Sequence, residues 1–68
     1  MENSNLQPLY DIPRYSRIRI EEEELNFYYI DGMYSYCEND RGKVINIGAN
    51  TMVQYVCSMK EHDLKKLN

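Results

Sequence analysis

The sequence contains few of the residues that usually stabilise very small domains or hold a metal ion. Its 68 residues include two cysteines, one histidine and no tryptophan. Cys37 and Cys57 are too few for the disulfide framework of a small secreted domain, which usually carries about four or more cysteines. Because the two cysteines do not form a CxxC pair, they and His62 lack the ligand spacing of a structural zinc site. We therefore expect free thiols, no metal site and no cofactor.

Long apolar segments and an excess of basic residues are also missing. No apolar run approaches the roughly 20 residues that span a bilayer, and residues 1–5 lack the basic and apolar regions of a signal peptide. The formal net charge is -3, whereas binding to nucleic acid without sequence preference requires clustered lysine and arginine. We expect a cytoplasmic protein that does not bind a membrane, and nucleic acid is a disfavoured partner.

Residue arrangements typical of enzymes are scarce as well. The sequence has no glycine-rich phosphate loop, and its single histidine, His62, lies near Cys57 in a tail where histidines are more often surface residues than catalytic bases. The carboxylates gather in one run, Glu21–Glu24, instead of pairing across a cleft. We interpret this run as a solvated loop, with contact to a basic partner as the alternative. We expect no catalytic activity.

Alternating polar and apolar residues predict β-strands in the middle of the chain. Ile18 and Ile20 alternate with charged residues, which is the pattern of a half-buried strand. The same reasoning predicts five strands, at residues 16–21, 25–30, 33–38, 43–47 and 51–56. Short strands at this spacing, joined by tight turns, are typical of a small antiparallel barrel. The expected fold class is therefore all-β, a five-stranded antiparallel SH3-like barrel.

The two ends of the chain differ from the middle and divide the sequence into three parts. Residues 1–14 contain both prolines and are expected to form an extended N-terminal segment. Residues 15–57 are the predicted barrel. Within residues 58–68, Ser58 and Glu61 match a helix capping box. We expect this last part to be a short helix or a frayed tail.

A hairpin is predicted where an aspartate and a glycine stand at residues 31–32, between two strand-forming segments. Asp-Gly favours a two-residue turn, because both central residues of a type I′ turn need positive φ angles. This turn would place Tyr29 opposite Tyr34. It would also place Phe27 opposite Tyr36, on the same face of the hairpin.

Tyrosine supplies seven of the eight aromatic residues and suggests a binding surface. We predict that Tyr29, Tyr34 and Tyr36 contact a protein partner, with Arg41 at the rim of the contact. Tyrosine and arginine are the residue types enriched at the energetic centres of interfaces. In the alternative, this face is the barrel interior. The residues that would then point outward or toward a dimer partner are Ile30, Met33 and Cys37.

A second set of residues suggests ligand binding. In an oligomer, Tyr28 would stack on a base while Arg17 or Arg19 binds a phosphate with two parallel hydrogen bonds. The chain would then sequester a nucleotide. The same tyrosines beside Arg17, Arg19 and Lys43 would also suit single-stranded nucleic acid, but the acidic net charge makes this the weakest alternative.

The segment Ile-Asp-Gly-Met-Tyr-Ser-Tyr-Cys at residues 30–37 is followed by a Gly-Lys-Val segment at 42–44 and Ala-Asn-Thr-Met-Val at 49–53. This arrangement resembles a loose class of small uncharacterised bacteriophage proteins with an Asp-Gly-Met-Tyr-Ser-x-Cys strand. The resemblance covers roughly residues 15–56. It implies a small β-barrel made early in infection, without known enzymatic activity. Together with the tyrosines, it leads us to expect a protein that binds and inhibits a host protein, in host takeover or anti-defence.

Overall fold

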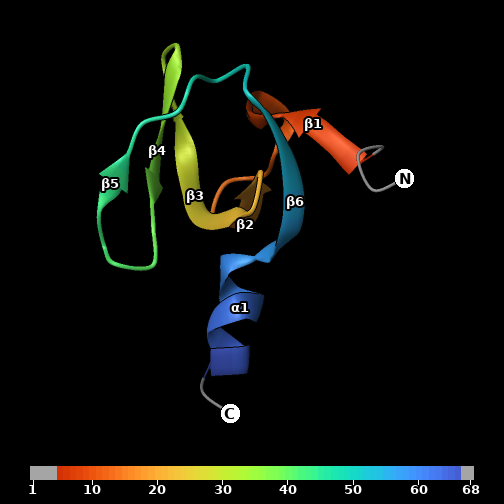
Figure 1. Ribbon diagram of the computed structural model, residues 1–68, viewed down its shortest axis with the longest axis vertical. Helices are drawn as coiled ribbons and strands as arrows, with labels where there is room; N and C mark the ends of the chain where they lie inside the picture. The colour runs from red at the N-terminus through yellow and green to blue at the C-terminus, as the bar shows by residue number, and fades with distance from the viewer. Residues whose placement is uncertain (1–4, 67–68) are drawn as a thin grey trace.

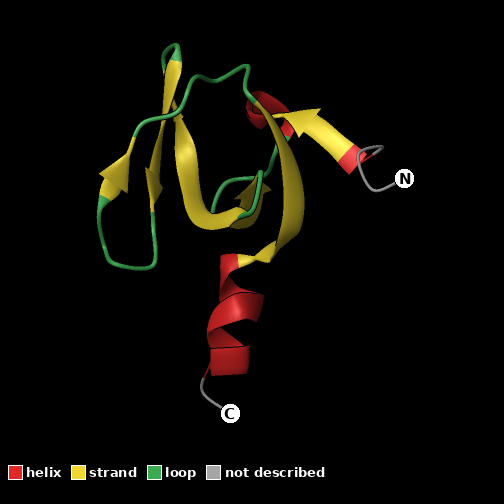
Figure 2. Ribbon diagram, viewed as in Figure 1, coloured by secondary structure: helices red, strands yellow, loops and turns green. Residues whose placement is uncertain are grey.

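A computed structural model of the chain describes residues 5–66, which form a mostly antiparallel β-sheet and one short C-terminal helix (Figure 1). The sheet has six strands in the order β1-β6-β2-β3-β4-β5. It curls but is not closed, so β1 and β5 form its two edges (Figure 2). The elements are β1 (Leu6–Pro8), β2 (Ser16–Ile20), β3 (Glu23–Asp31), β4 (Tyr34–Glu38), β5 (Val44–Ile45), β6 (Met52–Ser58) and α1 (Met59–Lys66).

The predicted antiparallel β-structure is confirmed, but the number of strands is six instead of five. The additional strand is β1, which lies within the predicted extended segment, residues 1–14. It pairs with β6. A 3₁₀ helix at Leu9–Asp11 follows, and its first residue is fully buried. The amide of Leu9 donates to the carbonyl oxygen of Thr51 at 2.9 Å, and that of Tyr10 donates to Ala49 at 3.0 Å. These bonds hold the N-terminal segment against the turn that precedes β6.

The buried core is aliphatic apart from one phenylalanine and one cysteine, and no tyrosine belongs to it. Ile18 and Leu25 come from neighbouring strands, as the period-two pattern predicts. Ser35 is also buried, and its hydroxyl donates to the carbonyl oxygen of Ile47 at 2.9 Å. The complete core consists of Leu9, Ile12, Ile18, Leu25, Phe27, Cys37 and Val53.

The turn between β3 and β4 lies one residue later than predicted. Asp31 is the last residue of β3 and pairs with Tyr34, so Gly32 and Met33 form the turn. Gly32 has a φ angle of 67°, while Met33 is not among the described residues with positive φ. A positive φ at the first central residue only is the geometry of a type II′ turn, which favours glycine there. The predicted pairing of Tyr29 with Tyr34 is therefore wrong.

A β-bulge in β3 changes the register a second time, between Phe27 and Tyr29. Tyr29 lies opposite Tyr36, whereas Phe27 lies opposite Cys37 instead of Tyr36. An inserted residue turns the following side chains to the other face of a strand. Phe27 is consequently buried, while Tyr28 and Tyr29 stand on the outer face of the sheet beside Tyr36.

The run of four glutamates is only partly a loop. Glu21 and Glu22 form the two-residue turn between β2 and β3, whereas Glu23 and Glu24 are the first residues of β3. The φ angle of Glu21 is 57°, a conformation that is uncommon for any residue other than glycine. The turn therefore holds a carboxylate at a position where glycine would be less strained.

The predicted C-terminal helix is present as α1, which extends away from the lower end of β6 (Figure 1). The Ser58 hydroxyl accepts a hydrogen bond from the amide of Glu61 at 3.0 Å, so Ser58 caps the helix. The helix contacts β2 and β6, and the amide of Met59 donates to the Tyr15 carbonyl oxygen at 2.8 Å. Residues 1–4 and 67–68 of the two predicted end segments lie outside the described residues. Within the described chain, α1 and the 3₁₀ helix are both too short and too polar to cross a membrane.

Candidate functional site

Four tyrosine rings contact one another in a row on the outer face of the sheet. The rings of Tyr29 and Tyr36 are stacked, with centroids 5.5 Å apart and planes 15° from parallel. Tyr36 also contacts Tyr28 at 5.2 Å, and Tyr28 meets the edge of Tyr15 at 6.2 Å. We call Tyr15, Tyr28, Tyr36 and Tyr29 the tyrosine row. It crosses β3 and β4 and continues to the residue before β2.

The tyrosine row is accessible to solvent at both ends. Tyr15 is 54% exposed and Tyr29 is 39% exposed, whereas Tyr28 and Tyr36 are half-buried between them. Tyr34 is 58% exposed and alternates with the buried Ser35, so it stands on the same face as Tyr36. The outer face of β4 therefore presents tyrosine to solvent along most of its length.

A hydrogen bond fixes the central ring of the tyrosine row. The hydroxyl of Tyr28 donates to Glu38 Oε1 at 2.7 Å. This bond, together with burial and the negative charge of Glu38, raises the pKa of Tyr28 to about 12 from its ordinary value of 10.0. Ionising the phenol would break the bond and place two negative charges side by side. Tyr28 thus stays neutral and is held in one orientation.

The Tyr28 bond predicts how stability changes at alkaline pH. Because the pKa of Tyr28 is higher in the folded protein, its stabilising effect is complete below pH 10 and is lost as the pH rises to about 12. We expect urea denaturation midpoints of the wild type and of Tyr28→Phe to differ most below pH 10 and to converge above it. A difference that stays constant across this range would contradict the proposed coupling to Glu38.

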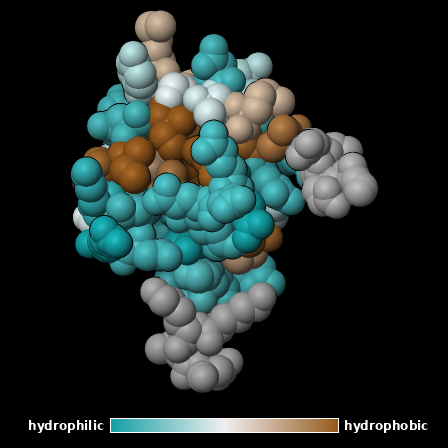
Figure 3. All heavy atoms as spheres, in the orientation of Figure 1, coloured by the Kyte–Doolittle hydropathy of each residue, from teal (hydrophilic) through white to brown (hydrophobic). Residues whose placement is uncertain are grey.

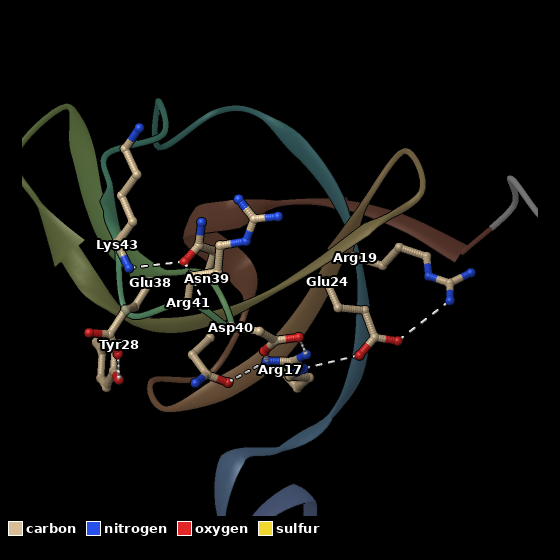
Figure 4. Close-up of polar contacts among 10 residues, drawn as sticks. Arg17, Arg19, Glu24, Tyr28, Glu38, Asn39, Asp40, Arg41 and Lys43 are labelled. Atoms are coloured by element: carbon tan, nitrogen blue, oxygen red, sulfur yellow. Dashed lines mark hydrogen bonds and ion pairs between the residues drawn. The ribbon is translucent and has the colours of Figure 1, made fainter.

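Arg17 is the most buried charged residue near the tyrosine row, with 3% of its surface exposed. Its guanidinium contacts Asp40 through both oxygens, at 2.9 and 3.1 Å, and Glu24 Oε1 at 3.0 Å (Figure 4). A further bond of 3.0 Å joins it to the side-chain oxygen of Asn26. Burial alone would lower the pKa of Arg17, but its bonds to Asp40 and Glu24 outweigh burial and raise it. The arginine therefore remains charged and bound within the protein.

The residues predicted to bind a ligand are already engaged with other side chains of the protein. Arg17 donates hydrogen bonds to Glu24, Asn26 and Asp40, and its Nη1 also lies 2.9 Å from Asp40 Oδ1. These contacts leave the guanidinium without a free edge for two-point phosphate binding. Arg19 is half-exposed and lies 3.4 Å from Glu24. Tyr28 belongs to the tyrosine row instead. The predicted rim residue, Arg41, lies in the β4–β5 turn, where it lines an acidic cleft with residues 22–24.

Potential catalytic and metal-binding groups are scattered. Cys37 is buried, and burial raises the pKa of its thiol, which works against formation of a reactive thiolate. Cys57 is half-buried and is also a free thiol. Within the described part of the chain, no three histidine, cysteine, aspartate or glutamate side chains come close enough to hold a metal ion.

Comparison of the chain with protein-family models, curated proteins and solved structures found no match.

Sequence patterns did not reveal every residue of the site. Tyr15 was missed because it precedes β2 and has a φ angle of 58°, a conformation that no alternation pattern indicates. Glu38 and Asp40 were missed because their roles depend on how β4 pairs with β3 and on how the β4–β5 turn reaches Arg17 of β2. A mild signal existed for Glu38, since it follows Tyr36 by two residues and so shares its face.

Proposed function

We propose that this chain is a non-catalytic binding protein that uses the outer face of β3 and β4 to hold a protein partner. The observation that carries the proposal is that the tyrosine row stands outside a core that contains no tyrosine. Tyrosine buries a large area, loses little conformational entropy and retains a polar tip, so exposed clusters of tyrosine suit protein interfaces.

The tyrosine row is also preorganised for binding. Ring stacking and the Tyr28–Glu38 bond restrict these side chains in the free protein. Binding a partner therefore costs less side-chain conformational entropy. Arg17 ties β2, β3 and the β4–β5 turn together on the same face of the sheet, which supports a rigid platform.

The class of partner in this proposal rests on the resemblance to phage proteins. On that basis the partner is a host protein in the bacterial cytoplasm, and binding inhibits it, as in host takeover or anti-defence. The curled sheet of short strands likewise supports assignment to the SH3-like small barrels.

Substitution of Tyr36, which contacts both Tyr28 and Tyr29, tests the surface. We expect the immobilised wild-type protein to capture one protein from a bacterial lysate in a stoichiometric amount. Immobilised Tyr36→Ala should capture at least about tenfold less of that protein. Tyr10→Ala is the matched control, because Tyr10 is 59% exposed but lies outside the tyrosine row. Tyr34→Ala shows whether the contact extends to the start of β4. Equal retention by Tyr36→Ala and the wild type, with both folded by circular dichroism, would refute the assignment.

Homo-oligomerisation and nucleotide sequestration remain as alternatives with less support. The sequence predicts that Arg17 or Arg19 would bind the phosphate of a nucleotide. Arg17 donates to Asp40, Glu24 and Asn26, and Arg19 contacts Glu24. The native mass of the purified protein decides whether a shared pocket between subunits exists at all. Mass spectrometry of any compound released on denaturation would reveal a bound nucleotide.

A further inference from the structure

A groove opens between the β2–β3 turn and the edge strand β5, and it is distinct from the tyrosine row. Its volume is about 380 Å³. The floor is aliphatic and the rim, residues 21–23, is acidic. Apolar area bordered by hydrophilic residues is visible on the face of the molecule shown in Figure 3. The floor consists of Ile20, Leu25, Ile45 and Ile47. We call this feature the acidic-rimmed groove.

The three rim carboxylates are available to a partner. Glu21, Glu22 and Glu23 are exposed, and no side-chain hydrogen bond or ion pair joins them to another of the described residues. The fourth glutamate of the run, Glu24, differs because it binds Arg17 and Arg19. The rim therefore carries three negative charges that the fold itself does not neutralise.

The two-residue edge strand β5 contributes Ile45 to the groove. Among the strands that the structure describes, β5 pairs only with β4, so the other side of its backbone has no strand partner. Such an edge can accept an extended peptide as an added strand, with alternate side chains directed to the neighbouring pocket. Ile45 of β5 lines the groove, so a strand added here would place side chains beside the aliphatic floor.

We propose that the acidic-rimmed groove binds an extended segment of a partner protein in which a large aliphatic side chain lies next to lysine or arginine. The aliphatic floor accepts the apolar side chain, the β5 edge pairs with the backbone, and the glutamate rim attracts the flanking cations. Charge complementarity selects this occupant over an acidic or neutral segment. The site is independent of the tyrosine row and goes beyond the function proposed above.

Titration of isotope-labelled protein with short synthetic peptides tests the site. The probe is a peptide with one leucine between lysines. We expect it to change the amide chemical shifts of the protein most at Ile20, Leu25, Ile45 and Ile47. Replacing the leucine of the peptide with glycine is expected to weaken binding by about tenfold or more. Replacing its lysines with glutamates is expected to abolish binding.

A charge-matched pair of protein variants separates the rim from the net charge. The triple variant Glu21→Gln, Glu22→Gln, Glu23→Gln is expected to bind the probe about tenfold more weakly, because each exposed ion pair contributes a few-fold. The control variant removes the same charge at exposed sites elsewhere and should change affinity by about twofold at most. Its substitutions are Asp11→Asn, Asp31→Asn and Asp63→Asn.

Three results would overturn the groove assignment. In the first, the two triple variants lose the same affinity for the peptide. In the second, the leucine and glycine peptides bind with the same affinity. In the third, the amide chemical shifts of the protein change outside the groove. Tyr36→Ala should leave peptide binding unchanged, so failure of the groove and failure of the tyrosine surface give different patterns.

Discussion

Phe27→Ala is expected to leave much of the protein unfolded at room temperature. Phe27 is 1% exposed and is the largest fully buried side chain, and truncation of a buried phenylalanine typically costs about 3–5 kcal/mol. At about 0.05–0.15 kcal/mol per residue, the total stability of a domain this small is about 3–10 kcal/mol. Circular dichroism in increasing urea should therefore show a much lower midpoint, or no folded baseline.

The matched control is Tyr29→Ala, two residues further along the same strand. Tyr29 is 39% exposed and stands on the opposite face because of the bulge, so its truncation should cost about 1 kcal/mol or less. Similar losses from both substitutions would mean that Tyr29 is part of the core. The tyrosine row would then be structural, and the proposed binding surface would be lost.

The hairpin shows how far the sequence specified the fold. Alternation correctly indicated that Tyr29, Tyr34 and Tyr36 share a face, although their pairings were wrong. Moving the turn by one residue shifts the partner of Tyr29 by two positions, from Tyr34 to Tyr36, and a shift of two preserves the face because strands have a period of two. The bulge shifts the register by one, so it moved Phe27 into the core without a visible signal.

The polar contacts were less predictable than the strands. Alternation with isoleucine indicates an exposed face for Arg17, which made it a candidate, with Arg19, for the alternative function of ligand binding. Its partners Glu24 and Asp40 lie 7 and 23 residues away, and only the curl of the sheet brings the β4–β5 turn over β2. Capping was easier to predict, because Ser58 and Glu61 are local partners three residues apart.

Arg17→Ala is expected to destabilise the protein by about 2 kcal/mol. Breaking a fully buried ion pair costs about 3–5 kcal/mol, but the side chains of Glu24 and Asp40 are 30% and 66% exposed, so water would partly solvate them. Arg17→Lys should recover part of this loss, because it restores the charge but not the two-point contact with Asp40. Urea denaturation with an unchanged m-value measures these differences.

Arg19→Ala provides the control, because Arg19 contacts the same carboxylate of Glu24 but is 49% exposed. An exposed ion pair of this kind contributes about 0.2–1 kcal/mol, so the midpoint should move little. The contrast distinguishes two roles for Arg17. If Arg17 stabilises the sheet beside the tyrosine row, stability falls, and partner binding weakens only as far as the folded fraction falls. If instead the Arg17→Ala midpoint equals that of Arg19→Ala while ligand binding disappears, the guanidinium serves a ligand, and nucleotide binding becomes the better explanation.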